Sequence, residues 1–189
     1  MKTELNRMLV ITTAVFLSVG CTTTPPGSES TSGTARLTAG DESAVRAVVA
    51  EFAETWNRHD MKAMHELNTA DVEWINVTAN HWRGNAVVYK GHDTIHRTVC
   101  ANTDMSVEQT LVRAVAPGVA IAVATMKFGR STLPSGEEVS ETRTRGSFTT
   151  VKEGERWKIV HFQNTVINAE AEKNDPITWD ETGYLPGRK

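Results

Sequence analysis

The 189-residue sequence contains only two cysteines, Cys21 and Cys100, so a framework of several disulfide bonds is excluded. It has no run of basic residues and a formal net charge of −3, which argues against a nucleic-acid-binding protein. A phosphate-binding loop, a dinucleotide fingerprint and a Ser-His-Asp order are also missing. An NAD-dependent enzyme is therefore not predicted, and we expect no cofactor.

A hydrophobic run long enough to cross a bilayer is lacking near the amino terminus, where residues 8–20 form a short apolar segment after Lys2 and Arg7. This pattern is typical of a signal peptide. The segment ends in Leu17-Ser18-Val19-Gly20-Cys21, which resembles the lipobox of bacterial lipoproteins, with Ser18 where the motif usually has Leu. The resemblance implies cleavage after Gly20 and acylation of Cys21. An ordinary cleaved signal peptide is the alternative.

Residues 22–40 are rich in Ser, Thr, Gly and Pro, a composition typical of a flexible tether. By resemblance to lipoprotein sorting, Thr22 after the cysteine implies the outer membrane rather than the inner one. We therefore expect a signal peptide at 1–20, a linker at 21–40, one globular domain at 41–168 and a tail at 169–189. The predicted location is the periplasmic side of the cell envelope, with the protein held there by its lipid anchor.

Helical periodicity dominates the first half of the domain. An apolar stripe predicts a helix over residues 41–57, capped by Thr38. Asp60 caps a second, shorter helix, and a third runs from Gly84 to about Val99. A strand over 71–78 lies between the second and third helices. Gly91 inside the third helix costs ~1 kcal/mol relative to Ala.

Strands make up the second half. We expect them at 107–116 and 119–129, followed by a hairpin over 143–168 that turns at Gly154. Unbroken alternation in the last strand predicts one face with Trp157, Ile159, His161, Gln163 and Thr165, and an opposite face with Val160, Phe162, Asn164 and Val166. Helices first and antiparallel strands last indicate an α+β domain with its helices on one sheet face.

The closing Phe162-Gln163-Asn164-Thr165, after three helices and a meander, resembles the SnoaL-like, nuclear transport factor two-like (ketosteroid isomerase-like) superfamily over residues 41–168. The same four residues, with Trp74-x-Asn76-Val77 and Trp82-Arg83-Gly84, are similar to its SgcJ/EcaC branch, whose members are labelled oxidoreductases. The resemblance implies a cone-shaped, curved antiparallel sheet with three N-terminal helices over one face, a cystatin-like roll. It also implies a helix-lined pocket and, usually, a dimer.

The same resemblance changes the expected chemistry. In ketosteroid isomerases the proton-abstracting aspartate lies five residues after the aspartate that opens this strand, and counting from Asp71 reaches Asn76. A carboxamide does not take a proton at pH 7, so that reaction is not predicted. A pocket tyrosine of the same enzymes lies eight residues after the glycine that starts the third helix. Counting from Gly84 reaches His92.

His92 and His96 share one helix face and resemble the zincin motif, with Asp93 in place of Glu. No third ligand is marked in the sequence, so we expect no metal. Two interpretations of His92 stay open. It is either a hydrogen-bond donor or general acid/base in the pocket, or one of two histidines partly covered at the helix flank.

The remaining candidate site residues are aromatic or polar, as expected for a pocket that is mostly apolar with a few placed polar groups. Gln163 and Asn164 point to opposite faces, so at most one of them lines a given cavity. The alternative for Asn76, Gln163 and Asn164 is hydrogen bonding of these amides to neighbouring backbone. Arg143 and Arg145 are predicted to form surface ion pairs. The predicted ligand-binding set is Trp56, Trp74, Asn76, Tyr89, His96, Phe162, Gln163 and Asn164.

Three functions stay open. The first is a lipid-anchored domain that binds a small apolar or aromatic molecule. The second is a cofactor-independent isomerase, cyclase or SgcJ/EcaC-type oxidoreductase with His92 as its catalytic residue. The third is an interaction domain whose cavity is filled by its own side chains. We also expect His92, Asn76 and Asn164 to share one cavity, and a homodimer through the opposite sheet face, because the last hairpin has apolar residues on both faces.

Overall fold

The computed structural model describes residues 35–133 and 135–174. The predicted signal peptide, Cys21 and most of the predicted linker lie outside these residues. Within them, no helix combines the length and apolar character needed to cross a membrane.

Helix α1 (Ala39–Asn57) forms where the apolar stripe predicted it. All six residues of the stripe are buried: Val45, Val48, Val49, Phe52, Ala53 and Trp56. Thr38 Oγ1 accepts a hydrogen bond from the Asp41 amide at 3.0 Å, which confirms the predicted cap. Asp60 likewise caps α2 (Met61–Glu66). Helix α3 (Asn85–His96) begins after Gly84 and ends three residues earlier than expected. A short helix, α4 (Ala169–Lys173), was not predicted.

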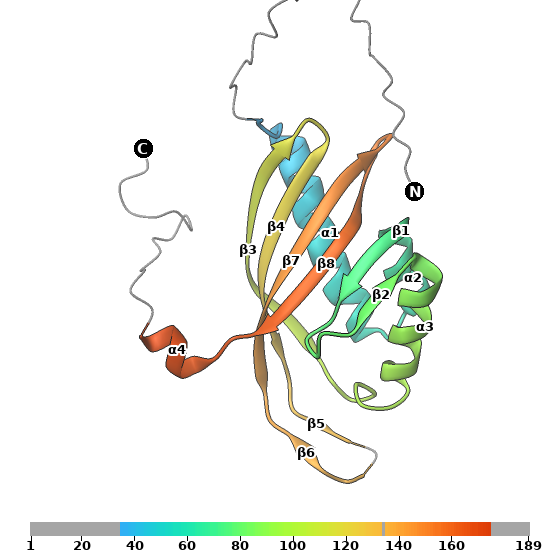
Figure 1. The fold of residues 1–189 in the computed structure, drawn as a ribbon, viewed down its shortest axis with the longest axis vertical. Coiled ribbons are helices and arrows are strands. Elements are labelled where there is room, and N and C mark those ends of the chain that lie inside the picture. Colours follow the sequence, from blue (N-terminus) through green and yellow to red (C-terminus); the bar gives the residue numbers. More distant parts are fainter. Residues whose placement is uncertain (1–34, 134, 175–189) are drawn as a thin grey trace, which may run out of the picture. The chain divides into compact units, whose positions relative to one another are not determined.

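The main sheet has six strands in the order β2-β1-β8-β7-β4-β3. Only the β1–β8 pair is parallel. A separate hairpin of β5 (Ser131–Thr132) and β6 (Glu138–Val139) lies between β4 and β7 in the sequence and extends away from the sheet (Figure 1). The main strands are β1 (Asn68–Ile75), β2 (His81–Arg83), β3 (Met105–Ala116), β4 (Val119–Phe128), β7 (Thr142–Glu153) and β8 (Arg156–Val166).

The core lies between α1 and the inner face of the curved sheet (Figure 1). Phe52 of α1 stands at its centre, with its ring centroid 5.7 Å from that of Trp74, 5.5 Å from that of Phe148 and 5.9 Å from that of Phe162. These rings come from β1, β7 and β8, so one helix residue joins three strands. The predicted fold class, an α+β domain with helices on the inner face of a curved sheet, is confirmed.

The predicted alternation along β8 is wrong in its second half. Thr149 pairs with His161 but Thr150 pairs with Ile159, so Val160 is an extra residue in a β-bulge. A bulge shifts the alternation by one residue. Trp157 and Ile159 therefore share the inner face with Phe162 rather than with Gln163.

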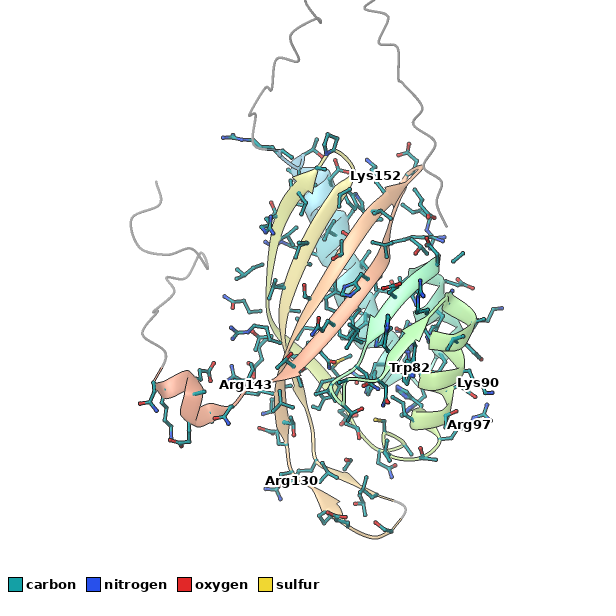
Figure 2. All side chains as sticks on the ribbon, in the orientation of Figure 1. Trp82, Lys90, Arg97, Arg130, Arg143 and Lys152 are labelled. Carbon is teal, nitrogen blue, oxygen red and sulfur yellow. The ribbon has the colours of Figure 1, made fainter. Side chains whose placement is uncertain are left out.

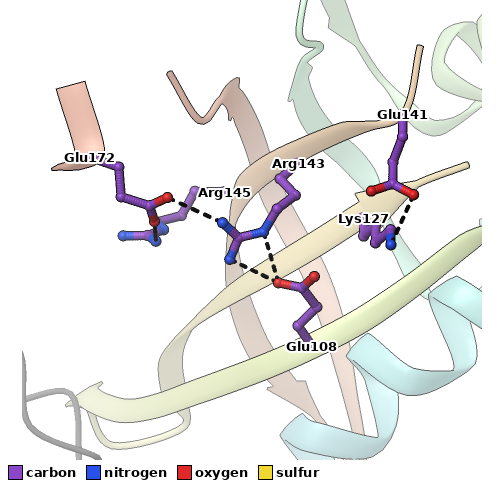
Figure 3. A network of polar contacts seen from close by, with 6 residues as sticks. All are labelled: Glu108, Lys127, Glu141, Arg143, Arg145 and Glu172. Carbon is purple, nitrogen blue, oxygen red and sulfur yellow. Dashed lines mark hydrogen bonds and ion pairs between the residues drawn. The ribbon is translucent and has the colours of Figure 1, made fainter. Parts of the chain in front are cut away.

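On the outer face, Arg143 of β7 pairs with Glu108 of β3 at 2.9 Å and with Glu172 of α4 at 3.1 Å (Figure 3). Arg145 lies 3.8 Å from the same Glu172. The predicted ion-pair role of both arginines is confirmed. Such exposed pairs are worth about 0–1 kcal/mol each, so they hold α4 against the sheet only weakly.

Candidate functional site

A cavity of about 460 Å³ opens between α1, α3, the β5–β6 hairpin and the inner face of the sheet. Among the described residues, no Lys, Arg, Asp or Glu lines it. The residues around it are Phe52, Trp56, Trp74, Asn76, Val77, Thr78, Asn80, Trp82, His92, Ile95, Val99, Cys100, Thr103, Met126, Phe128, Gly129, Ser131, Leu133, Val139, Ser140, Thr142, Thr144, Phe162, Asn164 and Val166.

Aromatic rings form one wall of this cavity. Trp74 and Phe162 are partners in the parallel β1–β8 pair, and their rings stack with centroids 4.1 Å apart and planes at 27°. Trp56 of α1 meets Phe128 edge-on at 5.3 Å. Such packing fixes the rings, since aromatic pairs favour offset-stacked and edge-to-face contacts. The wall is therefore a rigid apolar surface.

Three oxygens on the cavity wall are buried without a hydrogen-bond partner among the described residues: Asn164 Oδ1, Thr144 Oγ1 and Thr103 Oγ1. An unpaired buried polar group costs about 1–3 kcal/mol. The fold therefore carries a local loss of stability at this site.

Asn76 also lines the cavity, but its side-chain oxygen already has partners. It accepts hydrogen bonds from the Thr78 amide, the Thr78 hydroxyl and the Asn80 amide at 2.8–3.1 Å. These bonds close the turn between β1 and β2. The structure therefore supports the alternative in which the Asn76 amide forms hydrogen bonds with neighbouring backbone.

His92 is buried and lines the cavity from α3. Its Nδ1 lies 3.0 Å from Nε2 of His65, whose own Nδ1 lies 2.5 Å from the Met61 carbonyl oxygen. Because a carbonyl only accepts, His65 donates from Nδ1 and accepts at Nε2, and His92 donates from Nδ1. A neutral His92 then has an unprotonated Nε2, a hydrogen-bond acceptor rather than the expected donor.

Burial holds the pKa of His92 well below its usual value, and the neighbouring His65 and His96 lower it further. Burial also lowers the pKa of His65, and it lowers the pKa of His96 to about 4 with His59 contributing. The cluster is therefore neutral near pH 7. Near pH 7 His92 can accept a hydrogen bond through Nε2, and it can take up a proton only as a weak base.

The two histidines of the zincin-like pattern do not share a ligand. His96 Nδ1 lies 2.8 Å from His59 Nδ1, whereas His92 contacts His65. The described part of the chain contains no group of three or more His, Cys, Asp or Glu side chains placed to hold a metal ion.

The structure places six of the nine predicted site residues on the cavity: Trp56, Trp74, Asn76, His92, Phe162 and Asn164. The other three do not line it, which corrects their predicted placement. Tyr89 is 40% exposed and packs on the His65 ring. Gln163 lies on the outer face, and His96 is buried against Trp56 and His59.

Several lining residues were missed in the sequence. Thr144 shares its strand face with Gly146 and Phe148, so alternation along β7 would have found it. Trp82 also lines the cavity, although in the sequence it contributed only to the resemblance to the SgcJ/EcaC branch. The lining residues of the β5–β6 hairpin show no periodic pattern in the sequence, so side-chain periodicity does not indicate them. Cys100 also lines the cavity, and burial raises the pKa of its thiol to about 11, which keeps it protonated and unreactive.

Comparison with known proteins agrees with this fold. Residues 45–168 match the family model described as a SnoaL-like domain. The chain therefore belongs to the SnoaL-like family. No functionally curated protein sequence matches it.

Three of the similar solved structures illustrate the likeness. A Caulobacter vibrioides protein with a cystatin-like fold is 27% identical, with a TM-score of 0.67, over 71% of this chain and 95% of that one. A Novosphingobium aromaticivorans protein, described as NTF2-like with a cystatin-like fold, is 19% identical, with a TM-score of 0.58, over 71% and 87%. A ketosteroid isomerase-like protein from Erwinia carotovora atroseptica is 12% identical, with a TM-score of 0.58, over 69% and 99%. The last two, below 25% identity, support the fold alone.

Proposed function

We propose that this chain binds a small apolar or aromatic molecule in the cavity between its helices and its sheet. The observation that carries the proposal is the cavity itself, about 460 Å³ with an aromatic wall and no Lys, Arg, Asp or Glu among the lining residues that the structure describes. Ligand pockets of 300–1,000 Å³ are typically built this way. An interaction domain with a filled cavity is disfavoured, because this space is not filled by the chain's own described side chains.

Calorimetric titration with two neutral aromatic probes, 2-naphthol and 2-methoxynaphthalene, tests the proposal. Ile95→Trp places a large side chain in the cavity, whereas Val87→Trp adds the same group to an exposed position of the same helix. We expect binding by the parent chain and by Val87→Trp, and at least roughly tenfold weaker binding by Ile95→Trp, about 1.4 kcal/mol. Absence of binding of both probes to the parent chain would contradict the proposal.

A cofactor-independent enzyme is the second candidate, and the unprotonated Nε2 of His92 favours it. In this case His92 accepts a proton from a bound substrate, in an isomerase, cyclase or SgcJ/EcaC-type oxidoreductase. Placement in the SgcJ/EcaC branch rests on Phe162-Gln163-Asn164-Thr165 and the two tryptophan motifs. Conversion of a bound aromatic substrate, followed by mass spectrometry, would separate an enzyme from a binder.

Lipid anchoring on the periplasmic side of the outer membrane is part of the proposal and rests on the lipobox-like segment before Cys21. The Cys21→Ser precursor should stay out of the membrane fraction after cell fractionation. Membrane association of this variant, with the signal peptide still processed at the same site, would count against the anchor.

A homodimer through the outer sheet face completes the proposal. Leu111, Ile121 and Val123 form a half-buried apolar patch on β3 and β4, on the face opposite α1 (Figure 1). Val123→Lys should convert the dimer to a monomer in sedimentation analysis at tens of micromolar. A parent chain that is already monomeric at this concentration would exclude the dimer.

A further inference from the structure

Two of the three unpaired oxygens of the cavity lie on adjoining strands. β7 and β8 pair Thr144 with Val166 and Gly146 with Asn164. Thr144 and Asn164 are therefore diagonal neighbours on one face, with Cα atoms about 7–8 Å apart. Gly146, directly opposite Asn164, has no side chain with which to pair the amide. The Met126 methyl and the Phe162 ring occupy the space over Gly146. A small ligand group reaches both residues when the flexible Met126 side chain moves aside.

The two oxygens differ in what they require. Asn164 Oδ1 only accepts hydrogen bonds, whereas the Thr144 hydroxyl both donates and accepts. Thr144 is 2% exposed, so bulk solvent does not pair with its hydroxyl. A ligand hydroxyl satisfies both, because it donates to the amide oxygen and accepts from the threonine. An ether or ketone oxygen cannot donate to Asn164.

Charge limits the ligand further. No Lys or Arg of the described segments 35–133 and 135–174 lines the cavity, so none of them balances a carboxylate or a phosphate there. Figure 2 shows the labelled cations at the outside of the molecule. They are Lys90, Arg97, Arg130, Arg143 and Lys152.

We propose that the ligand is a neutral hydroxylated aromatic molecule of the phenol or naphthol class. Its ring packs on the Trp74–Phe162 wall, and its hydroxyl lies between Asn164 and Thr144. Asn164 follows Phe162 by two residues on the same strand face, so ring and hydroxyl contacts are adjacent. The inference rests on the proposed function, because it specifies the ligand of the same cavity.

The test compares 2-naphthol with 2-methoxynaphthalene, which keeps the rings and the oxygen but has no donor. Their dissociation constants are measured by calorimetry, and 2-naphthoate serves as the charged analogue. We expect 2-naphthol to bind roughly tenfold more tightly than the methyl ether, the value of about one hydrogen bond, and 2-naphthoate to bind more weakly than 2-naphthol.

Two near-isosteric variants, Asn164→Leu and Thr144→Val, should each reduce this preference to about threefold or less. Gln163→Leu and Thr165→Val change outer-face neighbours of the same types and should keep it. Because each site variant is informative alone, failure of one to fold leaves the other as the test.

The outcomes separate the two proposals. Equal binding of 2-naphthol and its methyl ether, or a preference that both site variants retain, overturns this inference and leaves the binding function intact. Tighter binding of 2-naphthoate also overturns it. Absence of binding of every probe overturns the proposed function and this inference with it.

Discussion

At the scale of single residues, His92 connects the cavity to a buried histidine neighbour. Its Nδ1 donates to His65 Nε2, so the unprotonated Nε2 of His92 is a hydrogen-bond acceptor. Gln and Leu are replacements of similar size for His92, but only the amide of Gln can both donate and accept hydrogen bonds.

We therefore expect His92→Gln to keep the free energy of unfolding within about 1 kcal/mol, whereas His92→Leu lowers it by about 1–3 kcal/mol because His65 Nε2 loses its buried partner. Urea denaturation measures both. If the Leu variant is as stable as the parent chain, the His65–His92 hydrogen bond does not support the fold.

The His92→Gln variant also distinguishes an enzyme from a simple binder. Gln cannot take up a proton, so an enzyme that uses His92 as a base should lose turnover in His92→Gln. A simple binder should keep its affinity for 2-naphthol within about threefold in this variant, since an acceptor remains in place.

At the scale of elements, α3 lies unusually close to β2. An added Cβ at Gly91 would lie 2.7 Å from two ring carbons of Trp82, a cavity-lining residue. Gly91 weakens the isolated helix, but its lack of a side chain allows α3 and β2 to approach each other. Glycine in an element interior often marks such a contact.

Gly91→Ala consequently has two opposed effects. Helix propensity favours Ala by ~1 kcal/mol, while displacement of the Trp82 ring costs about 1–3 kcal/mol. We expect net destabilisation and weaker probe binding. Ala at Val87, an exposed position of the same helix, is the control and should be neutral or slightly stabilising. If Gly91→Ala is more stable than the parent chain, the Trp82 ring moves aside without a measurable loss of unfolding free energy.

At the scale of the whole molecule, stability should fall in mild acid. The pKa values of His65, His92 and His96 are lowered by burial, to about 4 for His96. Between about pH 6.5 and 4 the unfolded chain therefore binds more protons than the folded chain. Each such histidine lowers the unfolding free energy by up to about 1.4 kcal/mol for each pH unit in its window.

Urea denaturation between pH 7.5 and 4.5 measures this slope. His96→Gln should reduce it, whereas His81→Gln, an exposed site outside the cluster, should not. Asp41 is separate, because hydrogen bonds from Lys152, Thr38 and Trp157 lower the pKa of its carboxyl to about 2, so its contribution is lost only below about pH 4. A flat profile from 7.5 to 4.5 would contradict the histidine prediction.

The sequence alone determined the elements whose pattern is local. The stripe of α1, its Thr38 cap and the hairpin turn at Gly154 follow from side-chain periodicity and backbone freedom within a few residues. The order of helices and strands then determined the fold class.

Only the tertiary structure decided which face meets the cavity. The bulge at Val160 moves Trp157 and Ile159 to the face of Phe162, and this depends on pairing with β7 rather than on β8 itself. The same holds for His65 beside His92 and for Thr144 beside Asn164, which are far apart in the sequence. Such contacts arise from strand register and helix docking, and no local pattern encodes them.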